Sequence, residues 1–284
     1  MMAEIIDGKK IAEEIEKNIK AELDALEKKY SKRPCLAVIL VGENAASKIY
    51  VQKKEEACDA VGVLFKKIEL PEATTEQELI KIIRELNNDN KIHGILVQLP
   101  LPTHIDSRKI INTISPTKDV DGLTAENMGN LLLNNEKILP CTPLGIITML
   151  KKIGVGVEGK NVVIVNHSKI VGRPLAAMLL NRNATPTICH IKTKDLKSQT
   201  LDADILVTAT GVPGLIKADM VKNGAVVIDG GIKKVGEKVV GDVEFESVLK
   251  KASYITPVPG GVGPMTVAMV LVNLVELFKE QIKK

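Results

Sequence analysis

A tyrosine and a lysine spaced four residues apart are well placed for proton-transfer chemistry. Tyr50 and Lys54 lie in residues 46–60, where the apolar pattern predicts a helix, so both side chains share one helix face. The helix follows a predicted buried strand at 35–41. A lysine that loses part of its hydration there has a lowered pKa and can act as an acid or a base near neutral pH. An ordinary solvated pair of helix residues is the alternative.

Two more polar residues stand where apolar or turn-forming segments end. Gln98 follows an apolar run that begins at Gly94 and stops in prolines, so its amide either bonds loop backbone or points toward Lys54. Asp121 belongs to KDVDG at 118–122, where Asp-Gly also favours a plain turn. Its carboxylate can instead accept two parallel hydrogen bonds from an amino-pyrimidine edge.

Two segments in the second half of the chain are suited to ligand binding through their backbone. VNHSKIVG, at 165–172, joins a predicted strand to a helix, but Asn166 and Ser168 replace the first two glycines of a dinucleotide fingerprint. The turn therefore either holds a pyrophosphate at the helix N-terminus or is an ordinary strand–helix turn. TPVPGGVGPMT, at 256–266, has three prolines and three glycines in eleven residues. This composition favours close approach of the main chain to a flat ligand over a linker.

Composition excludes several other classes of function. The 284 residues are 45% hydrophobic and 26% charged, which is typical of a globular protein, and the net charge of +4 is too small to indicate a nucleic-acid partner. The four cysteines lack metal or disulfide spacing and predict reduced thiols, and the four dispersed histidines predict no metal site. The N-terminus lacks the apolar run of a signal peptide, and we find no stretch of about 20 apolar residues, so no membrane partner is expected.

Strand and helix patterns alternate along nearly the whole chain, which predicts an α/β protein with parallel sheets. We expect two lobes facing each other across a cleft, with ligands beyond the carboxyl ends of the strands. The first lobe takes 1–140 together with 265–284, because a long apolar helix crosses back to it, and the second, 141–264, is Rossmann-like. The predicted strands are 35–41, 63–70, 94 onward, 161–165, 187–191, 204–209 and 225–229, and the predicted helices are 46–60, 75–89, 142–152, 171–182 and 265–279.

Five motifs occur together in one order. They are S-x-x-Y-V-x-x-K from Ser47 to Lys54, GILVQLPLP at 94–102, KDVDG at 118–122, S-x-I-V-G-x-P at 168–174 and PVPGGVGPMT at 257–266. In this combination the sequence resembles the bifunctional methylenetetrahydrofolate dehydrogenase/cyclohydrolase family, from IDGK at 6–9 to the final helix. The resemblance implies oxidation of 5,10-methylenetetrahydrofolate to 5,10-methenyltetrahydrofolate with NADP or NAD, followed by hydrolysis to 10-formyltetrahydrofolate.

The resemblance also implies roles for individual residues. Lys54 is the catalytic lysine, Tyr50 places the folate ring by stacking, and Gln98 bonds Lys54 and helps to keep it neutral. Asp121 anchors the pterin. The loop containing Pro259, Gly260 and Gly261 borders folate and nicotinamide. The residues implied in cofactor binding are Asn166, His167, Ser168, Ile191, Gly211 and Ile232.

At the level of the whole protein, the resemblance assigns residues 1–140 and 265–284 to a folate-binding catalytic domain and 141–264 to an NAD(P)-binding domain. It implies a cytoplasmic homodimer in one-carbon metabolism that serves purine biosynthesis, with no metal.

The sequence departs from the family pattern at two places. The family usually has Gly-Arg-Ser where this chain has Asn166-His167-Ser168, and often a small polar residue where it has Ile191. Loss of a permanent cation weakens a charge-assisted contact with a 2′-phosphate, which His167 or Lys192 would have to replace. We therefore expect relaxed cofactor preference or use of NAD.

Two other interpretations compete. A short-chain dehydrogenase shares the Y-x-x-x-K spacing, but that family has its glycine-rich turn near the start and the Tyr–Lys pair far downstream, the reverse of the order here. A non-catalytic or monofunctional folate- or nucleotide-binding protein on the same scaffold is the second. Retention of Tyr50, Lys54, Gln98 and Asp121 together argues against it.

Overall fold

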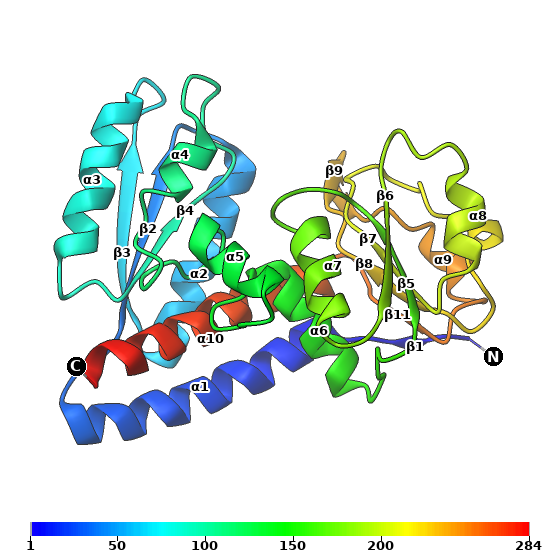
Figure 1. Cartoon of the computed structure of the whole chain (residues 1–284), viewed down its shortest axis with the longest axis horizontal. Helices are drawn as coiled ribbons and strands as arrows, with labels where there is room; N and C mark the ends of the chain where they lie inside the picture. Colours follow the sequence, from blue (N-terminus) through cyan, green and yellow to red (C-terminus); the bar gives the residue numbers. More distant parts are fainter. Residues whose placement is uncertain (1, 284) are drawn as a thin grey trace. The chain divides into compact units, whose positions relative to one another are not determined.

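The computed structural model describes residues 2–283, which divide into two compact units (Figure 1). Within the described residues, unit 1 comprises the chain up to Ala12 and Thr142–Thr266, and unit 2 comprises Glu13–Cys141 and the chain from Val267 onward. Two helices, α1 (Gly8–Tyr30) and α10 (Val262–Ile282), each begin in unit 1 and continue into unit 2.

Unit 1 is built on a six-stranded parallel sheet in the order β1-β11-β8-β7-β5-β6. Its strands are β1 (Glu4–Ile5), β5 (Asn161–Val165), β6 (Thr185–Cys189), β7 (Ile205–Thr208), β8 (Val226–Asp229) and β11 (Tyr254–Ile255). The chain leaves β5 toward β6 and then returns to place β7 on the other side of β5. The order of the strands therefore reverses between β5 and β7, and ligands of doubly wound sheets bind at such a point, beyond the carboxyl ends of the strands.

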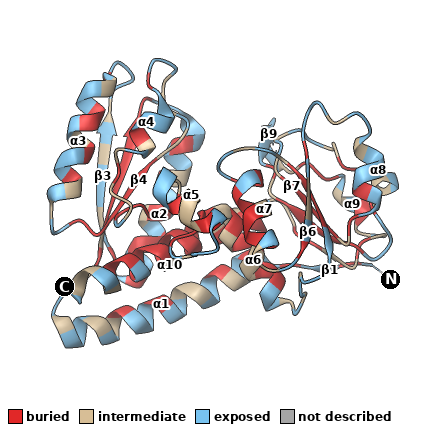
Figure 2. Cartoon of the chain, viewed as in Figure 1, coloured by how far each residue is buried: buried red, intermediate tan, exposed pale blue. Residues whose placement is uncertain are grey.

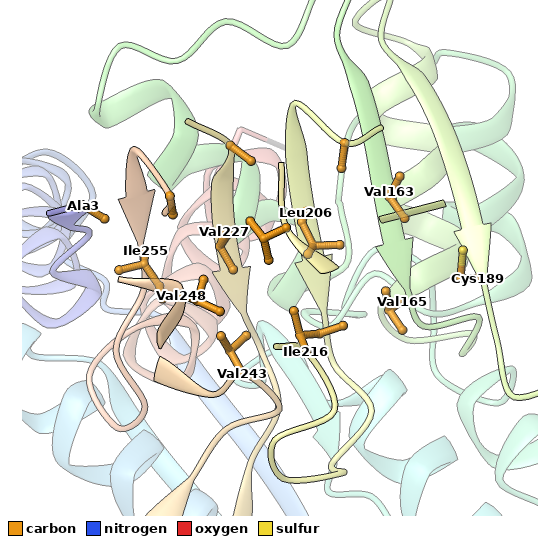
Figure 3. Packing of buried hydrophobic residues seen from close by; sticks show 14 residues of the cluster. Ala3, Val163, Val165, Cys189, Leu206, Ile216, Val227, Val243, Val248 and Ile255 are labelled. Carbon is orange, nitrogen blue, oxygen red and sulfur yellow. The ribbon is translucent and has the colours of Figure 1, made fainter. Parts of the chain in front are cut away.

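The remaining elements of unit 1 are short. They are α6 (Cys141–Lys152), α7 (Gly172–Leu180), α8 (Leu196–Leu201), a 3₁₀ turn (Ala218–Met220), the antiparallel hairpin β9 (Lys233–Val235) and β10 (Lys238–Val240), and α9 (Phe245–Val248). One face of the sheet is covered by a cluster of small aliphatic side chains. Figure 3 shows Ala3, Ile255, Val227, Leu206 and Val163 following one another across the sheet. β-branched residues dominate because they suit a pleated surface buried on both faces.

Unit 2 has a three-stranded parallel sheet in the order β3-β2-β4. The strands are β2 (Cys35–Val41), β3 (Leu64–Leu70) and β4 (Gly94–Val97), and the helices are α2 (Ala45–Val61), α3 (Glu76–Asn88), α4 (Ser107–Ile111) and α5 (Ala125–Leu132) together with most of α1 and α10. Asn44 caps α2 by accepting the Ser47 N–H, and Thr75 with Glu78 forms the predicted capping box of α3. The order again reverses beside β2, between β3 and β4.

Helix α10 is the main core helix of unit 2. Figure 2 shows it largely buried, and Leu274 and Phe278 are both 0% exposed. Burying such a side chain contributes roughly 1.5–3 kcal/mol. Contrary to the expectation from the sequence, α10 is by length and composition apolar enough to cross a membrane, and 67% of its most apolar window is buried inside the protein. That burial matches a core helix of a globular protein.

The fold class agrees with the sequence-based prediction, and the C-terminal helix does return to the first lobe, from Val267 onward. Three details differ. Residues 2–12 lie in unit 1, where β1 pairs with β11. Strand β6 spans Thr185–Cys189 instead of 187–191; Pro186 is tolerated because β6 is the last strand of its sheet. Helix α6 begins at Cys141, so Thr142 lies inside it and is not its N-cap.

Candidate active site

The predicted proton-transfer residues meet at the carboxyl end of the sheet of unit 2. Lys54 lies on α2, which follows β2, and Gln98 directly follows β4, the strand beside β2. The Nζ atom of Lys54 donates a hydrogen bond of 2.8 Å to Oε1 of Gln98. Tyr50 lies one helical turn before Lys54, and Nζ is 5.8 Å from the centre of its half-buried ring. The helical spacing therefore places Tyr50 beside Lys54, and the pairing of β2 with β4 brings Gln98 to them.

The amide of Gln98 is fixed in one orientation. Its Nε2 donates 2.8 Å to the Leu99 carbonyl, which leaves Oε1 free to accept from Lys54. Its backbone N–H donates 2.8 Å to the Ile39 carbonyl, which anchors the residue to β2. The following Leu99–Pro100 peptide bond is cis. Both alternatives considered for Gln98 are thus realised at once, since the side chain bonds loop backbone and faces Lys54.

A short segment beside β4 carries Asp121 toward the same end. Asp119 bridges Ile95 in parallel register, and Oδ2 of the buried Asp119 accepts the Thr124 N–H at 2.8 Å, which fixes the turn. Asp121 lies two residues further along, in the direction of Gln98. Of the two acidic residues in this motif, Asp119 is structural, whereas Asp121 interacts electrostatically with Lys54.

Burial and the neighbouring charges shift the pKa values of Lys54 and Asp121. Burial lowers the pKa of Lys54, which is only 6% exposed, whereas the carboxylate of Asp121 acts in the opposite direction. Burial raises the pKa of Asp121 to about 6, opposed by Lys54 and reinforced by Asp119. Burial thus favours the neutral form of both groups, and an amine and a carboxyl perturbed in this way are candidates for acid–base catalysis.

Two residues of this site were not predicted to belong to it. The thiol of Cys141 donates 3.2 Å to the Val120 carbonyl, and burial together with the nearby Asp121 carboxylate raises its pKa, so it stays protonated. The buried Asn273 of α10 donates 2.8 Å to the same carbonyl. The sequence offers no local signal for either, because each is joined to Asp121 only through the tertiary fold.

The predicted cofactor residues lie at the carboxyl edge of the sheet of unit 1. Asn166 follows β5 and its Nδ2 donates 2.5 Å to the Ala209 carbonyl after β7, so one side chain ties together the two strands where the order reverses. Its Oδ1 accepts the N–H groups of Ser168 at 2.8 Å and Gly172 at 3.0 Å. These two donors at the start of α7 are therefore already satisfied by the protein.

Two imidazole rings and one guanidinium lie around this turn. His167 and His190 have ring centres 5.1 Å apart, tilted by 52°. The Arg173 Nε donates 3.1 Å to the His167 carbonyl. Ile191 is 93% exposed and lies beyond the end of β6 rather than inside the strand. It presents an apolar surface, where a polar residue would offer a hydrogen bond.

The other predicted residues of unit 1 occupy neighbouring loops. Gly211 follows β7 with a φ of 71°, and the 44% exposed Ile232 follows β8. The Val258–Pro259 peptide bond is cis, and the Gly260 carbonyl accepts the Lys9 N–H at 2.9 Å. The predicted substrate residues are therefore divided: those before residue 122 meet in unit 2, whereas the 259–261 loop belongs to unit 1.

These loops fit a nicotinamide dinucleotide. The turns after β5, β7 and β8 carry Asn166–Ser168, Gly211 and Ile232, which are exposed or half-buried beside the point of strand reversal. Between residues 2 and 283, no group of three or more His, Cys, Asp or Glu side chains is arranged to hold a metal ion.

Two family models match the chain. One covers the residues predicted to transfer protons, and the other covers those predicted to bind the cofactor. The model for the tetrahydrofolate dehydrogenase/cyclohydrolase catalytic domain matches residues 6–121. The model for the tetrahydrofolate dehydrogenase/cyclohydrolase NAD(P)-binding domain matches residues 140–282.

Relatives and solved structures agree with these models. The chain is 54% identical to the bifunctional protein FolD of Moorella thermoacetica over 277 residues, 97% of this chain and 99% of that protein. It resembles the crystal structure of the bifunctional enzyme FolD from Campylobacter jejuni, with 49% identity, a TM-score of 0.95 and coverage of 97% and 98%. It also resembles the Trypanosoma brucei FolD complexed with NADP and an inhibitor, with 39% identity, a TM-score of 0.96 and full coverage of both chains.

Proposed function

The chain belongs to the tetrahydrofolate dehydrogenase/cyclohydrolase family, and on that premise we propose how its residues divide the work of the two reactions. It oxidises 5,10-methylenetetrahydrofolate with NAD(P) and hydrolyses the methenyl product to 10-formyltetrahydrofolate, as a bifunctional enzyme of one-carbon metabolism. The observation that carries our proposal is the buried Lys54, hydrogen-bonded to Gln98 and opposed in charge by Asp121.

In the hydrolysis, Lys54 moves the protons. Its neutral amine accepts a proton from the water that adds to the bridge carbon, and the ammonium then returns a proton to N5 as the C–N5 bond opens. The hydroxyl proton of the adduct passes to solvent, which balances the one proton released in each turnover. Gln98 orients the amine, and burial keeps the neutral form accessible.

In the oxidation, the residues of the chain align and bind. NAD(P), when bound, accepts a hydride from the methylene bridge. The cation left on the folate is stabilised by its own nitrogens, so alignment is the main requirement of the protein. We assign Tyr50 to stacking on the folate ring and Asp121 to the pterin, with Pro259, Gly260 and Gly261 bordering folate and nicotinamide. Asn166, His167, Ser168, Ile191, Gly211 and Ile232 bind the cofactor.

For the cofactor, we propose relaxed preference or use of NAD. Support comes from the exposed apolar Ile191 and from His167, which takes the place of a permanent cation. A spectrophotometric assay with methylenetetrahydrofolate, run in parallel with NADP and NAD, tests both the dehydrogenase assignment and the cofactor preference. Reduction of either cofactor supports the dehydrogenase assignment, and strong selectivity for NADP would refute the preference. If neither is reduced, methenyl hydrolysis alone or plain folate binding becomes the better account.

We further propose that the enzyme is a cytoplasmic homodimer formed through unit 1, and that its product serves purine biosynthesis. Strand β6 is the last strand of its sheet, and beside it Leu180 is 64% and Ile188 37% exposed. Unpaired edge strands and apolar patches favour association. Light scattering after gel filtration should give a dimer mass for the natural chain and a monomer mass for Leu180→Asp, and a monomeric natural chain would refute the dimer.

A further inference from the structure

Two buried carboxylates in unit 1 have no role in the two reactions described above. Asp229 is the last residue of β8 and is 3% exposed, and Asp242 follows β10 and is 0% exposed. They lie at the two ends of the β9–β10 segment, since Gly230, Gly231 and Ile232 follow Asp229 and Gly241 precedes Asp242. Carboxylates are rarely buried without a specific set of partners, because burial penalises their charge.

Asp229 fastens the base of the hairpin. Its Oδ1 accepts the N–H groups of Gly231 at 2.9 Å and Asp242 at 3.1 Å, and its Oδ2 accepts the Val243 N–H at 2.9 Å. A Cβ atom added to Gly241 would lie 2.0 Å from Oδ2. Only a glycine lets the backbone approach the carboxylate this closely, so both ends of the hairpin are drawn onto one side chain.

Asp242 links the end of the hairpin to β7, the strand beside β8. Its Oδ2 accepts the Thr208 hydroxyl at 2.7 Å and the Thr210 N–H at 2.5 Å, and its Oδ1 accepts the Val212 N–H at 3.0 Å. A Cβ atom added to Gly231 would lie 2.1 Å from Oδ1. The same carboxylate therefore touches the loop after β7 and the loop after β8.

The six donors to these two carboxylates are all uncharged: five are backbone N–H groups and one is the Thr208 hydroxyl. A carboxylate is an acceptor through both oxygens, whereas an amide offers acceptors on one atom only, so an amide in either place would face some of these N–H groups with its own. Burial raises the pKa of Asp229 to about 6, and the facing Asp242 reinforces that rise against the hydrogen bonds. Such a costly arrangement is typical of functional sites.

We infer that Asp242, held by Asp229, is a positioning residue that sets the loops carrying Gly211 and Ile232 for cofactor binding. Both loops leave the carboxyl ends of adjacent strands, where a dinucleotide binds in this type of sheet. The inference rests on the proposed function, because Gly211 and Ile232 are assigned to the cofactor there. Asp242 acts through backbone geometry and not by contact with the reacting atoms.

The test compares Asp242→Asn with Asp219→Asn, a control at an exposed ion pair with Lys197 in the same unit. NADP and NAD binding is measured by isothermal titration calorimetry, together with KM for each cofactor and the rate of methenyl hydrolysis. We expect Asp242→Asn to raise Kd and KM at least about tenfold, because buried N–H groups lose their acceptor, with hydrolysis within about twofold of the natural enzyme. Thr208→Val, which removes one hydrogen bond, should have a smaller effect in the same direction.

Unchanged cofactor Kd in Asp242→Asn would overturn the inference. So would a parallel loss of hydrolysis and thermal stability, which would make the carboxylate a general support of the fold. If Asp242→Asn does not fold, Thr208→Val decides by the same criteria. A natural chain that reduces neither NADP nor NAD refutes the proposed function instead, which separates the two failures.

Discussion

The Nζ atom of Lys54 lies 2.8 Å from Oε1 of Gln98, and this neutral acceptor holds the amine without supplying a negative charge. The distinction matters because a carboxylate at that place would favour the ammonium, whereas an amide orients the amine with much less effect on its charge. The ammonium form of Lys54 is favoured by the negative charge of Asp121. Asp121 loses this charge as its carboxyl is protonated, below a pH of about 6.

Replacing Lys54 by Met should abolish proton transfer and leave the cofactor site intact. General acid–base catalysis contributes roughly 100- to 10,000-fold, so methenyl hydrolysis should fall by about that factor, while Kd for NAD(P) stays unchanged. Absorbance decay of methenyltetrahydrofolate and calorimetry measure the two quantities. Lys53→Met, an exposed neighbour on α2, is the matched control. Retained hydrolysis in Lys54→Met would remove this lysine from the mechanism.

Replacing Gln98 by Glu should move the pH dependence of hydrolysis toward alkaline values. The new carboxylate raises the pKa of Lys54, so the neutral amine forms only at a higher pH, and the rising limb should shift upward by about 1–2 pH units. A pH–rate profile of methenyl hydrolysis measures it, corrected for the uncatalysed rate. Gln52→Glu, on the exposed side of α2, should leave the limb in place. A limb that does not move in Gln98→Glu would contradict the assignment of Lys54 as the titrating base.

Replacing Gly8 by Ala should displace the loop assigned to folate and nicotinamide. A Cβ atom at Gly8 would lie 2.0 Å from the Gly261 carbonyl oxygen, so the loop or α1 must shift. We expect dehydrogenase kcat/KM to fall by at least about tenfold, which corresponds to ~1.4 kcal/mol of lost alignment. Gly156→Ala, where nothing lies within 4 Å of the added atom, is the control. Equal activity of the two variants would show that the loop position is unimportant.

His93 should make stability depend on pH. Burial lowers its pKa to about 4, reinforced by Lys118 and Lys32. A base with a depressed folded pKa contributes stability that is present above the unfolded pKa of about 6.5 and is lost as pH falls toward 4. Between pH 7.5 and 5 the natural chain should lose about 2 kcal/mol more of its free energy of unfolding than His93→Gln does. Urea unfolding measures the difference, His104→Gln serves as the control, and equal losses would refute it.

Much of this fold is readable from local sequence. The strand at 35–41 and the strand at 161–165 were predicted with the boundaries that the structure has, because short, wholly apolar runs indicate buried parallel strands. The capping box at Thr75 was also readable, since its spacing is fixed by helix geometry. Strands β1 and β11 have two residues each and were missed, because only their pairing makes them strands.

The site divides in the same way. The spacing of Tyr50 and Lys54 is local and could be predicted, whereas the meeting of Lys54 with Gln98 follows from the adjacency of β2 and β4. The assignment of Gln98 and Asp121 to the site rested on the family resemblance and not on local spacing. Neither local spacing nor the resemblance predicted the hydrogen bonds of Asp229 and Asp242, because these side chains bond mainly to backbone N–H groups of loops.

The pairing of Glu4 with Tyr254 has a consequence for the synthesis of this protein. A chain leaves the ribosome from its N-terminus, so β1 emerges roughly 250 residues before the strand that will pair with it, at a rate of about 5–20 residues per second. Unit 2 likewise needs α10, which is made after the other elements of that unit. Both units therefore complete their cores only after a late segment has been made, β11 in unit 1 and α10 in unit 2. Until then β1 stays unpaired, and a chain truncated before β11 carries two incomplete units instead of one finished unit and one missing.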